Sequence, residues 1–356
     1  AEPIRIRLGV ARLGAGLWLP QPVAAALAAD HQAVSGLRKA LDRHGIEVVT
    51  LNAFPYAGFH AASVKKSVYH PDWTDPARLT YTLDCARVLA SVLPDDIETG
   101  SISTLPLAWR EPWSGQRADQ AYRQLNELTR GLEQLSAETG RRIRVGLEPE
   151  PGCVIEDTGQ AVGAFAGLDT KWLGLCLDTC HMAVAHEDPV TAIGRLRAAG
   201  VPVVKLQASC AVEAGQPANP AVRDALGAFA EPRFLHQTKE AARDGLRSAD
   251  DLADALAGDL PGEGRWRVHF HVPLHARLGG SLRSTQAVLL ATLAEMLSGT
   301  SPATNIIEVE TYTWSRLPGG EVEGGLVAGI AAELAWLREE LTALGLTTLG
   351  LAEVES

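Results

Sequence analysis

The stretch LGLCLDTCH, residues 173–181, is an apolar run that ends in an aspartate and a histidine. Such a run is typical of a buried strand, and Asp178 leaves its end. His181 follows three residues later on the next turn, so both side chains can point at one position. A carboxylate oxygen beside an imidazole nitrogen is a usual pair of metal ligands. The stretch therefore predicts a buried strand whose end contributes to a metal site.

Three further extended segments finish in the same kinds of side chain. A single carboxylate at a strand end can also be a helix N-cap. Four such ends in one chain favour one shared site instead. The three segments are RVGLEPEP (144–151) with Glu148 and Glu150, RVHFHVPLH (267–275) with His269, His271 and His275, and NIIEVETY (305–312) with Glu308 and Glu310.

Short aliphatic runs alternate with helical patterns along the whole chain. Strands that are apolar on both faces, alternating with amphipathic helices, imply a parallel sheet. Eight such units predict an α/β fold of the (β/α)8 TIM barrel type, a single domain over 1–356, with its working residues at strand C-termini. A doubly wound sheet is weaker, because no G-x-G-x-x-G or Walker loop follows a strand. The expected strands are 4–10, 48–54, 101–108, 144–150, 173–179, 201–209, 268–274 and 306–312, and the expected helices are about 22–44, 76–93, 117–140, 158–168, 187–200, 247–257, 284–298 and 324–345.

The bulk composition excludes several classes of function. The chain has 356 residues, is 46% hydrophobic, and carries a net charge of −11 without a basic run, which argues against a nucleic-acid surface. Small anionic ligands stay open, since a few lysines or arginines can bind them. The five cysteines show no paired framework, which favours reduced thiols and a cytoplasmic location. We find no transmembrane run and no signal peptide in the sequence as given.

Long connections are expected to cover the mouth of the barrel. Residues 55–75 are aromatic and include Lys65 and Lys66, residues 109–116 include two tryptophans, and residues 210–246 include FLHQTKE (234–240). Long loops over a barrel mouth usually cover a ligand. Aromatic side chains beside polar groups would suit a polyhydroxylated or cyclic substrate.

Several motifs carry a resemblance to known families. In order along the chain, LEPEPG (147–152), LDTCH (177–181), VHFHVP (268–273) and EVETYTW (308–314) resemble the xylose isomerase-like TIM barrel superfamily, which holds sugar isomerases, ketose 3-epimerases, endonuclease IV and multinuclear iron oxidases. More closely, residues 36–350 look like the EboE-type metabolite traffic proteins. That resemblance rests on LNAFPYAGFH (51–60), VKKSVYHPDW (64–73), GSISTLPLAW (100–109), LEPEPGC (147–153), LDTCHMAV (177–184), FLHQT (234–238) and ETYTW (310–314).

The resemblance implies a divalent metal such as Mn, Zn, Fe or Co, as one or two ions. Residue by residue, it places the metal ligands at Glu148, Asp178, His181 and Glu310, with Glu308 left open as an alternative to Glu310 by strand parity. Where the superfamily usually has a histidine, KLQAS offers Gln207. His269 and His271 resemble an Asp-x-His pair that holds an additional ion. On that reading residues 268–274 belong to the connection before the last strand, and seven barrel strands remain without the superfamily's opening strand.

The expected chemistry is that of a metal-dependent isomerase or epimerase acting on a small polyol, sugar phosphate or cyclitol. Glu148 and Glu310 are candidates to move the proton, and Lys205 to polarise a carbonyl. The expected substrate contacts are Asn52, His60, Gln207 and His236. Two alternatives stay open, a two-metal hydrolase or multinuclear metal oxidase, and a non-catalytic metabolite carrier. The EboE resemblance adds a membrane prenyltransferase-like partner and is compatible with a homo-oligomer.

Overall fold

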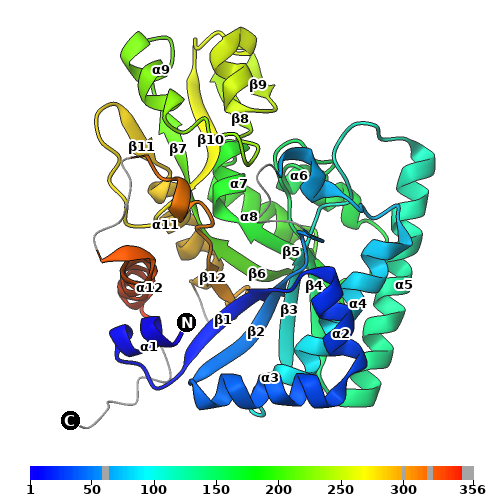
Figure 1. Cartoon of the computed structure of the whole chain (residues 1–356). Coiled ribbons are helices and arrows are strands. Elements are labelled where there is room, and N and C mark those ends of the chain that lie inside the picture. The colour runs from blue at the N-terminus through cyan, green and yellow to red at the C-terminus, as the bar shows by residue number, and fades with distance from the viewer. Residues whose placement is uncertain (58–63, 299–301, 319–323, 347–356) are drawn as a thin grey trace.

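The computed structural model describes residues 1–57, 64–298, 302–318 and 324–346 (Figure 1). Its main part is a seven-stranded parallel sheet that curls into a nearly closed barrel, which confirms the predicted fold class. Parallel strands need long crossovers, so their carboxyl ends gather at one end of the barrel. The strand order is β1 (Leu13–Trp18), β2 (Ile46–Asn52), β3 (Thr99–Thr104), β4 (Arg142–Leu147), β5 (Leu173–Asp178), β6 (Val203–Ala208) and β12 (Ile307–Val309).

Helices cover the outside of the barrel between successive strands. Six of them begin where an aspartate or serine side chain accepts a hydrogen bond from the first turn, which fixes where each helix starts: Asp30, Asp75, Ser114, Asp157, Asp178 and Asp188. The helices are α2 (Gln21–Ala29), α3 (His31–Arg43), α4 (Pro76–Val92), α5 (Gly115–Thr139), α6 (Thr158–Phe165), α7 (Thr179–Val184), α8 (Pro189–Ala198), α11 (Gln286–Leu297) and α12 (Gly325–Ala343), with short turns η1 (Lys65–Tyr69) and η3 (Trp314–Arg316).

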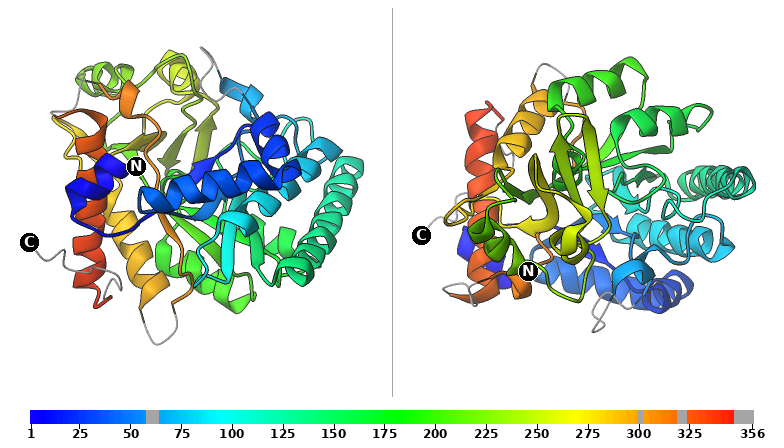
Figure 2. Two further views of the ribbon diagram at one scale, coloured as in Figure 1. Left: turned by 60° about the horizontal axis from the view of Figure 1, so that its bottom comes forward. Right: turned by 90° about the horizontal axis from the view of Figure 1, so that it is seen from above.

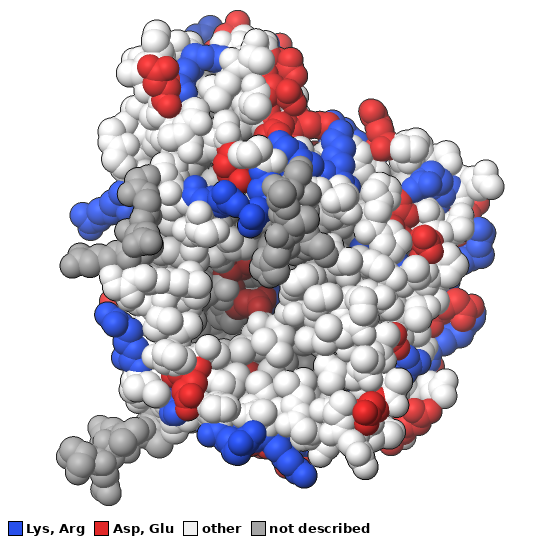
Figure 3. All heavy atoms as spheres, viewed as in Figure 1, with Lys and Arg blue, Asp and Glu red and all other residues white. Residues whose placement is uncertain are grey.

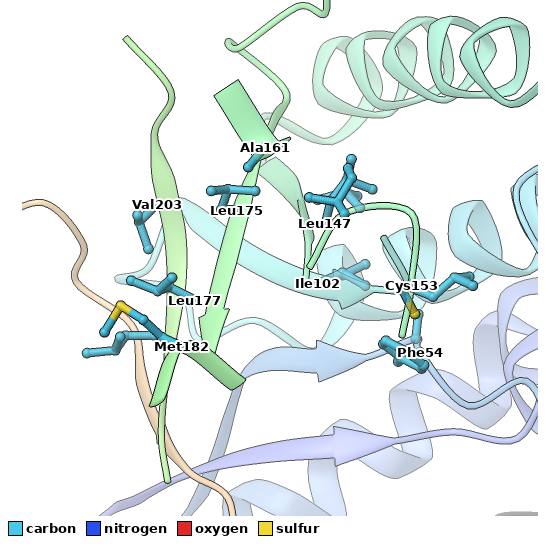
Figure 4. Close-up of a cluster of buried hydrophobic side chains, with 14 of the residues drawn as sticks. Phe54, Ile102, Leu147, Cys153, Ala161, Leu175, Leu177, Met182 and Val203 are labelled. Carbon is cyan, nitrogen blue, oxygen red and sulfur yellow. The ribbon is translucent and has the colours of Figure 1, made fainter. Parts of the chain in front are cut away.

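The core of the barrel is built from aliphatic side chains of neighbouring strands. Figure 4 shows Ile102 of β3 and Leu175 of β5 in this buried cluster, together with Leu147 of β4. All three are fully buried. The strand register places all three on one face of the sheet, and Gly146 and Cys176 on the opposite face are buried as well. Burial on both faces explains why β4 and β5 read as apolar runs.

A second, antiparallel sheet stands beyond the carboxyl ends of the barrel strands (Figures 1 and 2). It corrects two expectations. Residues 268–274 are not a barrel strand, because β10 (Arg265–Val272) pairs antiparallel with β7 (Cys210–Ala214) and β8 (Thr238–Ala242). The alternative interpretation is confirmed, since this segment belongs to the connection before the last strand and seven barrel strands remain. Residues 210–246 are not a loop, because they contain β7, α9 (Pro220–Gly227), β8 and the start of β9 (Gly245–Ala249). The remaining elements of this part are β11 (Leu282–Ser284), α10 (Leu252–Asp254) and the π-turn η2 (Ala255–Asp259).

The first barrel strand was not predicted, and the segment expected in its place is a helix. Residues 4–10 alternate isoleucine and arginine as a strand would, yet they lie largely in α1 (Glu2–Leu8). This helix has Pro3 in its first turn and is followed by Gly9, whose φ of 65° is typical of a helix C-cap. The strand is LGAGLW (13–18), whose glycines weaken the strand signal. Gly16 has a reason to be there, since a Cβ at this position would lie 1.5 Å from Oε1 of Glu308 in β12. The glycine lets the Glu308 side chain reach β1 across the barrel.

Two further features concern the whole chain. All five cysteines are buried and free of disulfides. Within the described ranges, no helix has the length and apolar character needed to cross a bilayer.

Candidate metal centre

Three carboxylates meet at the carboxyl end of the barrel. Glu148 follows β4, Asp178 ends β5 and Glu310 follows β12, and one oxygen of each lies within 4.8 Å of the other two. Among the described residues, Glu148 Oε2, Asp178 Oδ2 and Glu310 Oε2 are buried without a hydrogen-bond partner. Buried oxygens without a partner are costly unless a cation lies among them. This arrangement fits a divalent metal ion.

The electrostatics of the carboxylates support that interpretation. Burial raises the pKa of Glu148 well above its usual range, and the neighbouring Glu310 and Asp178 raise it further. Burial likewise raises the pKa of Glu310, again with Asp178 adding to the effect. Such clustering of like charges disfavours ionisation in the empty protein. A bound cation reverses that preference.

Asp178 is held so that one oxygen stays free. Its Oδ1 accepts hydrogen bonds from the backbone N–H of His181 and from Ser209 Oγ, both at 2.8 Å. The first bond makes Asp178 the N-cap of α7. Asp178 is therefore a helix cap through Oδ1 and a candidate ligand through Oδ2.

Three histidines present lone pairs to the same region. His181 Nδ1 donates to the Pro149 carbonyl at 2.9 Å, and His271 Nδ1 donates to the Glu310 carbonyl at 2.8 Å. His269 Nδ1 lies 2.7 Å from Gln237 Oε1. Carbonyl and amide oxygens only accept hydrogen bonds, so each Nδ1 carries the proton and each Nε2 carries a lone pair. Such bonds on the far nitrogen are typical of metal-binding histidines.

The histidine Nε2 atoms need a cation. His181 Nε2 and His269 Nε2 face each other at 3.0 Å, and in the described chain His271 Nε2 is buried without a partner. Burial lowers the pKa of His269 and His271, that of His271 to about 4, so neither ring holds an extra proton near neutral pH. Two facing lone pairs at this distance repel each other, and a metal ion removes the repulsion.

The ligand atoms fall into adjacent groups that share residues. Asp178 belongs both to the group with Glu148 and Glu310 and to a second group with His181 and His271. His269 and His271 also form a third group with the Cys180 thiol. A carboxylate shared by two groups is a suitable bridge between two ions.

Glu308 has a different partner, which distinguishes it from Glu310. Lys205 of β6 is fully buried, and its Nζ lies 2.5 Å from Glu308 Oε2 and 3.2 Å from Ser103 Oγ. Burial alone would lower the pKa of Lys205, but the carboxylates of Glu308 and Glu310 raise it above its usual value. Glu310 thus joins the group of possible ligands, while Glu308 forms an ion pair.

The predicted substrate contacts lie in different places. Asn52 lines the cavity, and its Oδ1 accepts the Phe54 N–H at 2.9 Å. Gln207 is buried, does not line the cavity, and accepts a hydrogen bond from the Cys176 thiol through Oε1 at 2.9 Å. His236 does not line the cavity, because its ring nitrogens contact the His269 carbonyl and Glu231. The predicted His60 lies outside the described residues.

Sequence reasoning missed the residues that orient the ligands. Gln237 donates through Nε2 to the Pro151 carbonyl at 2.9 Å, which turns its Oε1 towards His269. Glu333 of α12 is buried and accepts hydrogen bonds from Leu274 N and Thr311 Oγ1. It therefore joins the segments that follow His271 and Glu310. Gln237 lies inside the FLHQT motif and could have been chosen, whereas Glu333 reads as an ordinary helix residue.

A cavity opens onto this centre. It has a volume of about 300 Å³, and its floor contains Glu148, Glu310, His181, His269 and His271. Figure 3 shows a hollow on this face with acidic atoms at its bottom. The size suits a small metabolite.

Comparison with known proteins identifies the family. A family model described as xylose isomerase-like TIM barrel matches residues 10–218, more than half of the chain. No curated protein matches the chain.

The chain is also similar to solved structures of low sequence identity. A xylose isomerase domain protein from Planctomyces limnophilus is 12% identical, with 93% of this chain and 97% of that chain covered and a TM-score of 0.49. A xylose isomerase domain protein from Alicyclobacillus acidocaldarius is 15% identical, with 97% and 93% covered and a TM-score of 0.49. The probable 3-DHS dehydratase AsbF from Bacillus anthracis is 16% identical, with 58% and 66% covered and a TM-score of 0.38. This chain spans slightly less than two thirds of that last structure.

Proposed function

The chain belongs to the xylose isomerase-like TIM barrel family, and from this premise we propose that it is a metal-dependent enzyme of the isomerase or epimerase type. Its substrate is a small metabolite with a hydroxyl beside a carbonyl. The observation that carries the proposal is the set of buried carboxylate oxygens without hydrogen-bond partners in the described chain, on Glu148, Asp178 and Glu310. They converge on one point, and Glu148 and Glu310 also line the floor of a cavity large enough for such a molecule.

A divalent ion bound there would act as a Lewis acid and draw charge from a carbonyl oxygen. Glu148 and Glu310 come from different strands, so they can approach a substrate from two sides. Burial and mutual repulsion raise the pKa of both carboxyls above the usual range, which favours proton uptake by either group. One carboxylate takes the proton from carbon and the other returns it.

Lys205 affects the ionisation of the two candidate acid–base residues. Its ammonium lowers the pKa of both Glu148 and Glu310, opposing the effect of burial. Its ion pair with Glu308 fixes it in place. We propose that Lys205 keeps the carboxylates ionised, and that Asn52, which lines the cavity, contacts the substrate.

A second candidate function has its own support. The group formed by Asp178, His181 and His271 lies beside the carboxylate group and shares Asp178 with it. Two ions about 3.5–4 Å apart are the usual arrangement of a binuclear hydrolase. A hydrolase or a multinuclear oxidase is therefore the alternative.

Elemental analysis and a proton-exchange assay separate the two candidates. The metal-loaded protein is incubated with dihydroxyacetone or D-fructose in D2O, and deuterium incorporation at the carbon beside the carbonyl is followed by NMR. Incorporation that needs the metal and is lost in Glu310→Gln supports the isomerase. Two or more ions per chain without any incorporation favour hydrolysis or oxidation. A chain that binds no metal would overturn both candidates.

The closer EboE-type assignment is also a proposal. Its support is that the motifs behind it supply the centre: LEPEPGC gives Glu148, LDTCHMAV gives Asp178 and His181, FLHQT gives Gln237 and ETYTW gives Glu310. A cytoplasmic enzyme that meets a membrane prenyltransferase-like partner is the corresponding biological expectation.

A further inference from the structure

The cavity has a polar floor and an apolar wall. The floor consists of the possible metal ligands. Above it, the wall is formed mainly by aromatic and aliphatic side chains, among them Leu17, Trp18, Phe54, Pro55, Val68 and Phe234. These side chains come from four separate stretches of the chain: the end of β1, the segment after β2, η1 and the segment before β8. This apolar lining therefore surrounds the part of a ligand that extends away from the metal.

Most polar groups in the described wall already have protein partners. Trp18 Nε1 donates to the Pro55 carbonyl at 2.7 Å, and Tyr69 Oη donates to Glu150 Oε1 at 2.7 Å. Thr311 Oγ1 donates to Glu333 Oε1 at 2.7 Å. These donors are therefore engaged before any ligand arrives.

Two further polar side chains of the described wall, those of Lys65 and Asn52, are wholly or partly engaged by the protein. Lys65 is ion-paired with Asp251 at the base of the second sheet. Asn52 uses its amide oxygen for the Phe54 N–H, which leaves its amide nitrogen as a donor. A sugar chain brings a hydroxyl on nearly every carbon, and each buried hydroxyl needs a partner. The described wall offers too few partners for a polyol.

We infer that the substrate has an apolar, flat body joined to one end that carries two neighbouring oxygens. The oxygens lie at the floor, and the body lies against Trp18, Phe54 and Phe234. This inference rests on the proposed metal centre and changes its substrate class from a polyol to an aryl or other apolar hydroxy-carbonyl compound. Aromatic rings favour flat partners, because ring faces and edges attract each other in stacked or edge-to-face geometry.

Three hydroxamates test the inference, because they share one metal-binding head and differ in the tail. Acetohydroxamate carries a methyl group, benzohydroxamate a phenyl ring and gluconohydroxamate a polyol chain. Dissociation constants are measured calorimetrically on the metal-loaded full chain, with chelated protein as the reference. We expect benzohydroxamate to bind about tenfold to a hundredfold tighter than acetohydroxamate, from burial of the ring. Gluconohydroxamate should bind no tighter than acetohydroxamate.

The outcomes distinguish this inference from the proposal on which it rests. If gluconohydroxamate binds tightest, or if all three bind equally, the apolar substrate class is wrong while the metal centre stands. If each hydroxamate binds chelated protein as tightly as metal-loaded protein, or if none of the three binds, the proposed metal centre itself is wrong.

Two variants test whether the wall side chains cause the preference for the phenyl tail. Trp18→Ala should reduce the affinity for benzohydroxamate about tenfold and leave that for acetohydroxamate unchanged. Trp113→Ala is the matched control, because this partly buried loop tryptophan lies outside the cavity, and it should change neither affinity. Val68→Thr adds a hydroxyl to the wall at nearly constant volume, and it should reduce the ratio by which benzohydroxamate binds tighter than acetohydroxamate. This variant keeps the test available if Trp18→Ala folds poorly. A preference that survives both wall variants would overturn the inference.

Discussion

Replacing Asp178 with asparagine exchanges the carboxylate for an amide of the same shape. In the wild type, Asp178 Oδ1 accepts hydrogen bonds from His181 N and Ser209 Oγ, and the side-chain oxygen of an asparagine can accept the same two bonds. Asp178 Oδ2 is buried and is the atom available to a metal. The amide nitrogen that replaces it can donate to Glu148 or Glu310. We therefore expect the metal-free variant to fold with a stability within about 1 kcal/mol of the wild type.

The size of the stabilisation by metal depends on Asp178 being part of two groups of possible ligands. Each ion stabilises the folded chain by about 2.7 kcal/mol when its concentration is a hundred times its dissociation constant. Asp178 belongs to both groups of possible ligands, so the variant weakens both ions. Loss of a residue that merely orients a ligand costs about 10–100-fold in metal affinity, and loss of a shared ligand should cost more. The wild type should thus gain about 5 kcal/mol from metal, and the variant close to none.

The assay is thermal unfolding with chelator and with added Mn²⁺ or Zn²⁺, together with elemental analysis. Metal should raise the melting temperature of the wild type by several degrees and leave that of Asp178→Asn unchanged. Asp188→Asn is a matched control, because Asp188 caps α8 in the same manner and accepts from Thr191, away from the cavity. It should keep the full metal response. Full metal content in Asp178→Asn, or an unfolded metal-free variant, would refute the reasoning.

Three further predictions follow from buried charges and from the overall charge. Burial raises the pKa of Glu333 to about 7, so the folded state binds its proton more tightly than the unfolded chain does. The stability of the fold should therefore fall by up to about 3 kcal/mol as pH rises from about 4.5 to 7, and Glu333→Gln should flatten that slope in denaturant titrations; parallel curves for both proteins would contradict this. Lys205→Met leaves Glu308 without its partner and should cost about 3–5 kcal/mol in free energy of unfolding, most of which a Lys205→Met/Glu308→Gln double variant recovers; equal losses in both variants would show that the pair is not coupled. With a net charge of −11, the chain should not bind an abasic DNA duplex at moderate ionic strength, and salt-dependent binding below micromolar concentration would count against that expectation.

The polar residues at the strand ends were predictable because each follows a local sequence pattern. A buried parallel strand is a continuous apolar run, so the polar residue at its end is conspicuous in the sequence. Asp178 and Glu148 were found in this way, and the structure brings them together with Glu310. The pairing of Glu308 with Lys205 was not visible, because strand parity places Glu308 and Glu310 on the same side. Only the lysine on the neighbouring strand β6 distinguishes the two glutamates.

Other parts of the fold depend on contacts far apart in the sequence. The first strand holds Gly16 because Glu308 of the last strand occupies the space of a side chain, and that requirement weakens the local strand signal. Glu333 reads as part of an ordinary helix, yet it accepts bonds from Leu274 and Thr311, residues 59 and 22 positions away. His236 resembled a substrate contact because of its motif, but its ring supports β10 instead. Local patterns do not encode such partners.

An anomalous difference map from crystals soaked in Mn²⁺ or Zn²⁺ tests the metal centre most directly. We predict a peak about 2.0–2.2 Å from the free oxygens of Glu148, Asp178 and Glu310. We predict a second peak, also on Asp178, at a similar distance from Nε2 of His181 and His271. A map with metal in excess and no peak within about 4 Å of these atoms would contradict the proposed metal centre.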